Sequence, residues 1–274
     1  MWRFVAIPIA LALIGGCARS SPGTGEEGNE AQAETPTPTA EFDATTGQAP
    51  RASSAPPPDS MADAAGGSDD DAAVHIELEG PTTALVVFDK SGSMTAGWGD
   101  QTKWAAAGEA LVGAIEPVQD RLTLGAIFFP QGGDCTVPGL EAPTQMAFVS
   151  GSEFLARWSD VFSLNPAEGA TPMVSALREA DRAIRIAQDR GVAHERFSVI
   201  VLTDGEPNCD EDFAILEQLP AQWLEEGIRT HVIGLPGSEP AADLLDAIAK
   251  AGGTEKHQSP GDPGELAHDI AAAL

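Results

Sequence analysis

The feature that most constrains the fold is an uninterrupted apolar run that ends in a cluster of oxygen-bearing side chains. Residues 84–88 read Ala-Leu-Val-Val-Phe with no polar alternation, which is typical of a strand covered on both faces in a parallel sheet. Asp89, Ser91 and Ser93 follow at once, and Gly92 between the serines permits a tight turn. A carboxylate with two hydroxyls offers hard oxygen ligands that suit Mg²⁺ or Mn²⁺ rather than zinc. The sequence therefore predicts a buried strand with potential metal ligands at its carboxyl end.

Two later stretches are predicted to bring further oxygens to the same place. Residues 197–204 form a second buried-strand pattern that ends in an acid, Asp204. Thr171 lies in a turn between the two strands and precedes Pro172, which suits the first position of a helix because its missing N–H is not needed there. Ligands of doubly wound sheets gather at the carboxyl ends of the strands. These oxygens are therefore expected to meet those that follow residues 84–88.

Beyond about residue 80, strand-like and helix-like segments alternate along the chain. Helices are predicted over residues 103–115, 152–162, 171–190, 212–226, 240–251 and 263–274. Further strands are predicted over residues 121–129, 144–149, 228–235 and 253–258, with a short leading strand over 74–78. This alternation predicts an α/β fold: a doubly wound, mostly parallel central sheet with helices on both faces.

Taken in order, the three motifs resemble the von Willebrand factor A (vWA) domain family and its metal-ion-dependent adhesion site. The motifs are the Asp-x-Ser-x-Ser sequence that begins at Asp89, the turn threonine before proline, and the Thr-Asp-Gly at the end of the second strand. The resemblance covers about residues 80–274 and implies the Rossmann-like vWA fold. It implies as ligands of one Mg²⁺ ion (or Mn²⁺ or Ca²⁺) the following set: Asp89, Ser91, Ser93, Thr171 and Asp204. One departure is Ala170, where a second glycine often precedes the threonine.

In this family the hydroxyls ligate the ion, while the acids bind it directly or through water. Two carboxylates and three neutral oxygens leave one octahedral position open, which the Glu or Asp side chain of a partner protein can fill. The implied function is a metal-dependent protein-binding or adhesion module of the cell envelope, and not an enzyme.

The same residues also have structural alternatives. Asp89 and Ser91 can cap the helix that follows them, and Thr171 can be the N-cap of the helix at Pro172. A structural envelope protein with an empty site is then one alternative function. A metal-assisted hydrolase on a similar sheet is another, but it needs a base near Asp89 that the sequence does not offer, and no G-x-S-x-G nucleophile elbow occurs.

The N-terminal region is expected to direct export rather than to fold. Residues 1–16 carry Arg3 and a short apolar stretch, which predicts a signal peptide. The sequence before Cys17 looks like a bacterial lipobox, so Cys17 is predicted to be lipidated, with ordinary cleavage as the alternative. Residues 17–75, rich in Pro, Ala, Gly and acids, predict a disordered tether. The expected location is the cell envelope, with a lipid anchor, in the outer membrane or facing the periplasm.

Charge and cysteine content limit the partners and the compartment. The formal net charge of −27 excludes a basic patch for nucleic acid and disfavours anionic lipid surfaces. Apart from Cys17, only Cys135 and Cys209 remain, both in predicted loops at the metal edge. An even number in an oxidising compartment favours a disulfide, with free thiols as the alternative. Glu206 and Asp210 lie near the same edge, where they can tune partner choice or remain solvated loop acids.

Overall fold

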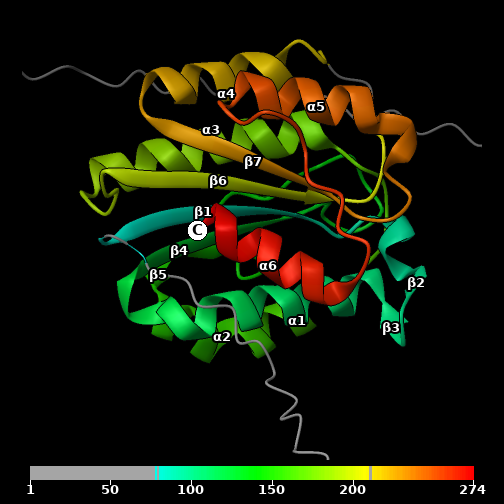
Figure 1. Ribbon diagram of the computed structural model, residues 1–274, viewed down its shortest axis with the longest axis horizontal. Helices are drawn as coiled ribbons and strands as arrows, with labels where there is room; N and C mark the ends of the chain where they lie inside the picture. Colours follow the sequence, from blue (N-terminus) through cyan, green and yellow to red (C-terminus); the bar gives the residue numbers. More distant parts are fainter. Residues whose placement is uncertain (1–77, 79, 210–211) are drawn as a thin grey trace, which may run out of the picture. The chain divides into compact units, whose positions relative to one another are not determined.

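A five-stranded sheet forms the centre of the computed structural model, which describes residues 78, 80–209 and 212–274. The strand order is β5-β4-β1-β6-β7 (Figure 1). β1 pairs in parallel with β4 and β6, and β6 with β7, whereas β5 runs antiparallel to β4 at the edge. The strand bounds are β1 Thr82–Asp89, β4 Leu122–Phe129, β5 Met146–Ser150, β6 Arg196–Thr203 and β7 Ile228–Gly234. The predicted α/β fold with a mostly parallel sheet is confirmed.

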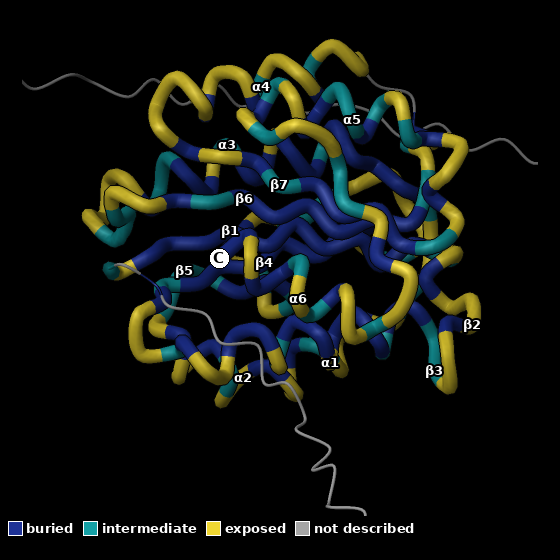
Figure 2. The backbone as a smooth tube through the Cα atoms, viewed as in Figure 1, coloured by how far each residue is buried: buried dark blue, intermediate teal, exposed yellow. Residues whose placement is uncertain are grey.

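Helices cover both faces of the sheet, which explains why the first strand lacks polar alternation. Successive side chains of a strand point to opposite faces. Val86 and Phe88 of β1 pack with α1 (Lys103–Ile115), α2 (Gly151–Ser163) and α6 (Pro263–Ala273) in one core. The other core contains Leu85 and Val87 together with α3 (Met173–Asp189), α4 (Ile215–Glu225) and α5 (Ala242–Ala251). Figure 2 shows the strands as the buried layer between helices whose outer turns are exposed.

Three details differ from the sequence-based expectations. Residues 253–258 form no strand, and only Gln258 makes an isolated bridge to Ile233. Pro172 is the N-cap of α3 rather than its first helical residue. A small hairpin of β2 (Gly97–Trp98) and β3 (Gln101–Thr102) was not predicted. Short 3-10 turns complete the fold: η1 (Gly92–Thr95), η2 (Glu116–Arg121) and η3 (Glu239–Ala241).

The signal peptide, Cys17, the tether over residues 17–75 and most of the leading strand over 74–78 lie outside the described residues. Within the part of the chain that the structure describes, no helix combines the length and apolar character needed to cross a bilayer.

The start of α1 is fixed by a side-chain cap. The Thr102 hydroxyl accepts a hydrogen bond from the backbone N–H of Ala105 at 3.2 Å, which satisfies one of the free donors of the first turn. The cap places Lys103 at the first position of the helix. A lysine is unfavourable there on its own, because the N-terminus of a helix carries partial positive charge.

Candidate metal centre

The predicted ligands gather at the carboxyl edge of the parallel strands. Asp89 is the last residue of β1, and Asp204 directly follows β6. The two strands are neighbours in parallel register, with Phe88 opposite Leu202, so the two acids leave the sheet side by side. Ser91 and Ser93 lie in the turn after β1, the second of them within η1. Asp89 and Asp204 are both buried, at 0% and 2% exposure.

Three of the five predicted ligands form a continuous chain of oxygens. The Ser91 and Ser93 hydroxyls lie 3.0 Å apart, and Ser93 Oγ donates to Asp204 Oδ1 at 2.6 Å. Neighbouring ligands of an octahedral Mg²⁺ ion, each at about 2.1 Å from the metal, are about 3 Å apart. The separation of the Ser91 and Ser93 hydroxyls therefore fits a small divalent cation. The described residues contain no group of three or more His, Cys, Asp or Glu side chains able to hold a metal, so the candidate centre depends on its hydroxyls.

Asp89 is a buried carboxylate whose hydrogen-bond partners are all neutral. Its Oδ1 accepts from the backbone N–H of Ser91 at 2.7 Å, and its Oδ2 accepts from the Thr203 hydroxyl at 2.7 Å. The pKa of Asp89 is raised from 3.8 to about 6, mainly by burial and to a smaller extent by the charge of Asp204, although both hydrogen bonds act to lower it. Within the described residues Asp89 forms no ion pair. A buried charge without a cationic partner is costly, and a bound divalent cation would supply that partner.

Thr171 reaches the site on a loop that is tied to the serine turn. The backbone N–H of Gly92 donates to Gly169 O at 3.0 Å, and the N–H of Thr171 donates to the Asn208 side chain at 2.8 Å. Gly169 has a φ of +88°, and a Cβ there would lie 2.4 Å from Gly132 O, so only glycine fits. Thr171 is 3% exposed.

The capping alternatives are only partly realised. The Thr171 hydroxyl does not cap α3, whose N-cap is Pro172, and it forms no hydrogen bond with another described residue. The Ser91 hydroxyl does not cap η1. Asp89 does accept the N–H of Ser91 and so stabilises the turn. The hydroxyls of Ser91 and Thr171 are therefore not committed to helix ends.

Lys103 belongs to the site, although its place in the sequence predicts only the start of a helix. Its ammonium forms an ion pair with Asp204 Oδ2 and donates to Pro236 O at 2.8 Å. Lys103 is 5% exposed. The pair joins residues 101 positions apart, so no local pattern could predict it. The only signal was a lysine in the first turn of a helix, where its charge is unfavourable.

A disulfide between Cys135 and Cys209 connects the loop after β4 to the loop after β6. The two cysteines thus pair as the sequence predicts. Cys209 follows Asn208, whose side chain holds the backbone of Thr171. Asn208 was not predicted, and only its place next to a cysteine could have suggested it. Glu206 is exposed, and Asp210 lies outside the described residues.

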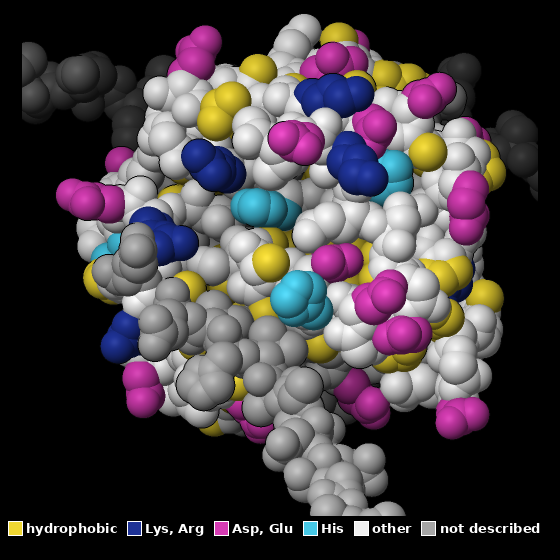
Figure 3. All heavy atoms as spheres, viewed as in Figure 1, with side chains coloured by type: hydrophobic (Ala, Val, Ile, Leu, Met, Phe, Trp, Pro, Cys, Tyr) yellow, Lys and Arg dark blue, Asp and Glu magenta, His cyan; other side chains and the backbone are white. Residues whose placement is uncertain are grey.

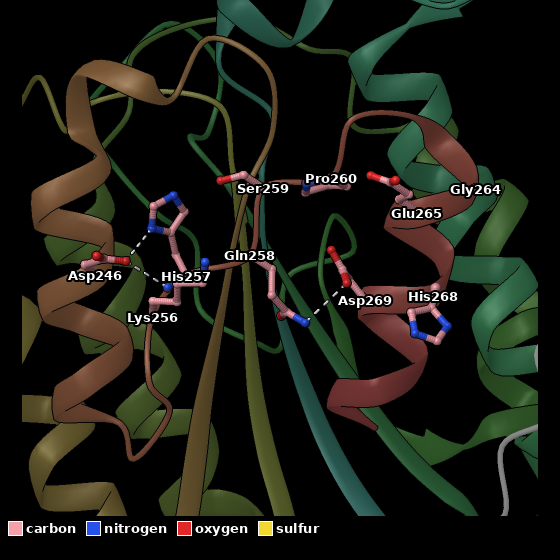
Figure 4. Close-up of a pocket in the computed structure, with 10 residues that line it drawn as sticks. All are labelled: Asp246, Lys256, His257, Gln258, Ser259, Pro260, Gly264, Glu265, His268 and Asp269. Atoms are coloured by element: carbon pink, nitrogen blue, oxygen red, sulfur yellow. Dashed lines mark hydrogen bonds and ion pairs between the residues drawn. The ribbon is translucent and has the colours of Figure 1, made fainter.

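A hollow of about 870 Å³ lies elsewhere in the described part of the chain, between α5 and α6. Figure 4 shows Asp246 on α5 hydrogen-bonded to His257, with Glu265 and Asp269 on α6 across the hollow. The distance from Asp246 Oδ1 to His257 Nδ1 is 2.7 Å. Ser259 makes no hydrogen bond with His257, so the described residues hold no assembled Ser-His-Asp triad here.

Comparisons with known proteins support the fold. No family model matches the chain, and no curated protein matches it. Among solved structures, it is similar to the SpRpn10 VWA domain, with a TM-score of 0.51 and 15% identity over 69% of this chain and 93% of that one. It is also similar to a von Willebrand factor type A protein from Catenulispora acidiphila, with a TM-score of 0.54 and 23% identity over 70% and 42% of the two chains.

A third similar structure is the pilus adhesin SpaC from Lactobacillus rhamnosus GG, with a TM-score of 0.53 and 12% identity. The match covers 71% of this chain but only 30% of the adhesin, so the likeness concerns one part of that protein. At these identities the matches describe architecture. The sheet order, the helices on both faces and these neighbours together show that the described part of the chain has the fold of a vWA domain.

Proposed function

We propose that this chain is a metal-dependent protein-binding module of the cell envelope. Its site would hold Mg²⁺, or Mn²⁺ or Ca²⁺, through the five oxygen-bearing residues named above: Asp89, Ser91, Ser93, Thr171 and Asp204. A cation bound there supplies positive charge and an open coordination position. These residues would hold the cation, and a Glu or Asp side chain of a partner protein would complete its coordination shell.

The observation that carries the proposal is the convergence of these oxygens from three separate segments onto one edge of the sheet. The hydroxyls of Ser91 and Ser93 lie at the separation of neighbouring octahedral ligands. Asp89, fully buried beside them, has neutral partners only. A pilus adhesin among the similar structures, and a minor pilin, PilB from Streptococcus sanguinis at 15% identity and a TM-score of 0.52, agree with a binding role.

The surface charge also favours recognition through a metal. On the face seen in Figure 3, Asp and Glu side chains are spread over the helices, and the Lys and Arg side chains lie among them without forming a basic patch. Such a face offers an acidic ligand no concentrated positive charge. A bound divalent cation would supply that charge for a partner carboxylate.

Isothermal titration of the purified full chain with Mg²⁺ and with Mn²⁺ tests this function. We expect saturable heats for the natural protein and none for Ser93→Ala, which removes the Ser93 hydroxyl from the proposed ligand set. Ser152→Ala is the matched control, because Ser152 is an exposed serine in the first turn of α2. Identical heats for the natural protein and Ser93→Ala would contradict the proposed metal site.

We further propose that Cys17 carries a lipid that anchors the chain to the envelope. The support is the sequence alone, since Cys17 lies outside the described residues. Metabolic labelling with a radioactive fatty acid is expected to mark the natural protein and not Cys17→Ala. Equal labelling of both would contradict the anchor.

A further inference from the structure

A buried lysine is built into the acidic half of the candidate centre. Lys103 Nζ pairs with Asp204 Oδ2 and donates to Pro236 O at 2.8 Å. The next residue, Gly237, has a φ of +105°, and a Cβ there would lie 3.3 Å from Lys103 Nζ and 3.3 Å from Asp204 O. The ammonium therefore lies in a closely fitting position formed by the loop after β7.

Asp204 is shared between this ammonium and the oxygen chain. Its Oδ1 accepts from Ser93 Oγ at 2.6 Å, whereas its Oδ2 faces Lys103. Only one of the two oxygens is thus directed toward the predicted metal ligands. Because opposite charges in contact offset each other, Asp204 presents less negative charge to a cation than an unpaired carboxylate does.

The charge balance of the centre follows from these contacts. Asp89 and Asp204 are two buried acids, and the buried Lys103 offsets one of them. Glu239 also faces Lys103, but it is exposed, so its charge is screened by solvent. Lys90, the other lysine at this edge, donates to Pro166 O at 3.2 Å and is subject to the opposite charges of Glu168 and, less strongly, of Asp89, so Glu168 offsets its charge first. A divalent cation would then leave the centre with one net positive charge. Without Lys103 the same centre would be neutral.

We propose that Lys103 determines the ligand specificity of the loaded centre: by pairing with Asp204 it keeps the centre net positive, so that the centre selects an anionic ligand with a single carboxylate. The same charge repels the metal and lowers the affinity for it. This inference rests on the proposed function, because it concerns the centre when a divalent cation is bound.

The test removes the charge of Lys103 and measures two affinities in the full chain. For Lys103→Met we expect Mg²⁺ binding that is tighter by at least about tenfold, since the repulsion between the ammonium and the metal is removed. We expect acetate, a probe for the carboxylate, to bind the Mn²⁺-loaded variant at least about tenfold more weakly than the natural protein. Titration calorimetry measures the metal, and water-proton relaxation of the Mn²⁺ complex measures acetate.

Tighter Mg²⁺ binding together with weaker acetate binding distinguishes an effect of charge from damage to the fold, because a damaged fold would weaken the binding of both Mg²⁺ and acetate. Lys250→Met is the matched control, because Lys250 is an exposed lysine in the last turn of α5, and we expect neither affinity to change. Lys103→Gln keeps a hydrogen-bond donor without the charge and is expected to behave like Lys103→Met.

Unchanged affinities in both Lys103 variants would overturn the role of Lys103 and leave the metal site standing. A folded natural protein that binds neither Mg²⁺ nor Mn²⁺ would overturn the proposed function, and the present inference with it. Should neither variant fold, the natural Mn²⁺ complex still provides a test: acetate is expected to bind at least about tenfold more tightly than neutral acetamide. Equal binding of the two would overturn the inference.

Discussion

The two halves of the candidate centre each contain a buried aspartate, and they differ in which groups stabilise its charge. Asp89 and Asp204 end neighbouring parallel strands and are both buried. Asp89 has neutral partners, a backbone N–H and the Thr203 hydroxyl, whereas Asp204 has the ammonium of Lys103. A fixed ammonium thus contacts one acid, whereas within the described residues no cationic side chain contacts the other. A bound divalent cation is therefore expected to stabilise mainly the charge of Asp89, because Lys103 already stabilises that of Asp204.

Asp204→Ala is expected to produce the largest loss of stability. The change leaves Lys103 buried without its carboxylate, and breaking a buried ion pair from one side costs about 3–5 kcal/mol. Urea unfolding in the presence of a chelator measures it. The double variant Asp204→Ala with Lys103→Met is the control, and it is expected to recover part of the loss. If Asp204→Ala is as stable as the natural protein, Lys103 does not depend on Asp204 for its stability.

Asp89→Asn is expected to increase the stability of the metal-free protein, whereas Asp204→Ala decreases it. The rise in the pKa of Asp89 from 3.8 to about 6 corresponds to about 3 kcal/mol of cost for the charged form at neutral pH. The substitution removes this charge, so we expect it to stabilise the metal-free protein by up to about 3 kcal/mol at pH 7.

The pH dependence gives the sign of this effect. Because the pKa of Asp89 is raised in the folded protein, the favourable contribution of its protonated form is complete below 3.8 and is lost as the pH rises through about 6. The advantage of Asp89→Asn is therefore expected to shrink as the pH falls from 7 to 4. Unfolding free energies measured across this range with chelator present check it, and a constant difference would contradict it.

Asn208→Ala tests the support of the threonine loop. The variant removes the acceptor for the backbone N–H of Thr171, and a hydrogen bond of this kind contributes about 1 kcal/mol to stability. We expect a loss of that size, together with weaker Mg²⁺ binding because Thr171 is less firmly positioned. Asn208→Asp keeps the acceptor and is the control. Equal Mg²⁺ affinity in Asn208→Ala and the natural protein would contradict the positioning role.

Thr171→Val is expected to change stability least, by less than about 0.5 kcal/mol, because the hydroxyl forms no hydrogen bond with another described residue and the shape is kept. Mg²⁺ binding is nevertheless expected to fall by at least about tenfold, since a ligand oxygen is lost. Thermal unfolding and calorimetry measure the two quantities. Unchanged Mg²⁺ affinity would remove Thr171 from the proposed ligand set.

The sequence predicted the scaffold of this edge better than its charge balance. Both strands can be predicted from the apolar runs before Asp89 and Asp204, because a strand buried on both faces lacks polar alternation. Neighbouring strands then bring their ends together whatever their separation in the chain. The pairing of Lys103 with Asp204 depends instead on the rotation of α1 and on the loop at Pro236, which no local pattern encodes.

The wrong predictions also have physical reasons. Residues 253–258 were predicted as a strand after α5, but only Gln258 bridges to β7, and the Thr254 hydroxyl donates to Ala249 O at the end of α5. Pro172 would suit the first turn of a helix, but its ψ of 63° keeps it outside α3. In both cases a short segment was suited to two conformations, and its contacts with neighbouring elements decided between them.

The close approach at Gly169 brings three segments of the candidate centre into contact. Through it the turn after β1, the loop after β4 and the threonine loop touch backbone to backbone, since Gly169 O accepts from Gly92 and a Cβ at Gly169 would meet Gly132. These segments therefore support one another's positions. Gly132 has a φ of +58°, so a larger residue there would strain the backbone that contacts Gly169. Such a change is expected to alter the metal affinity although Gly132 provides no ligand.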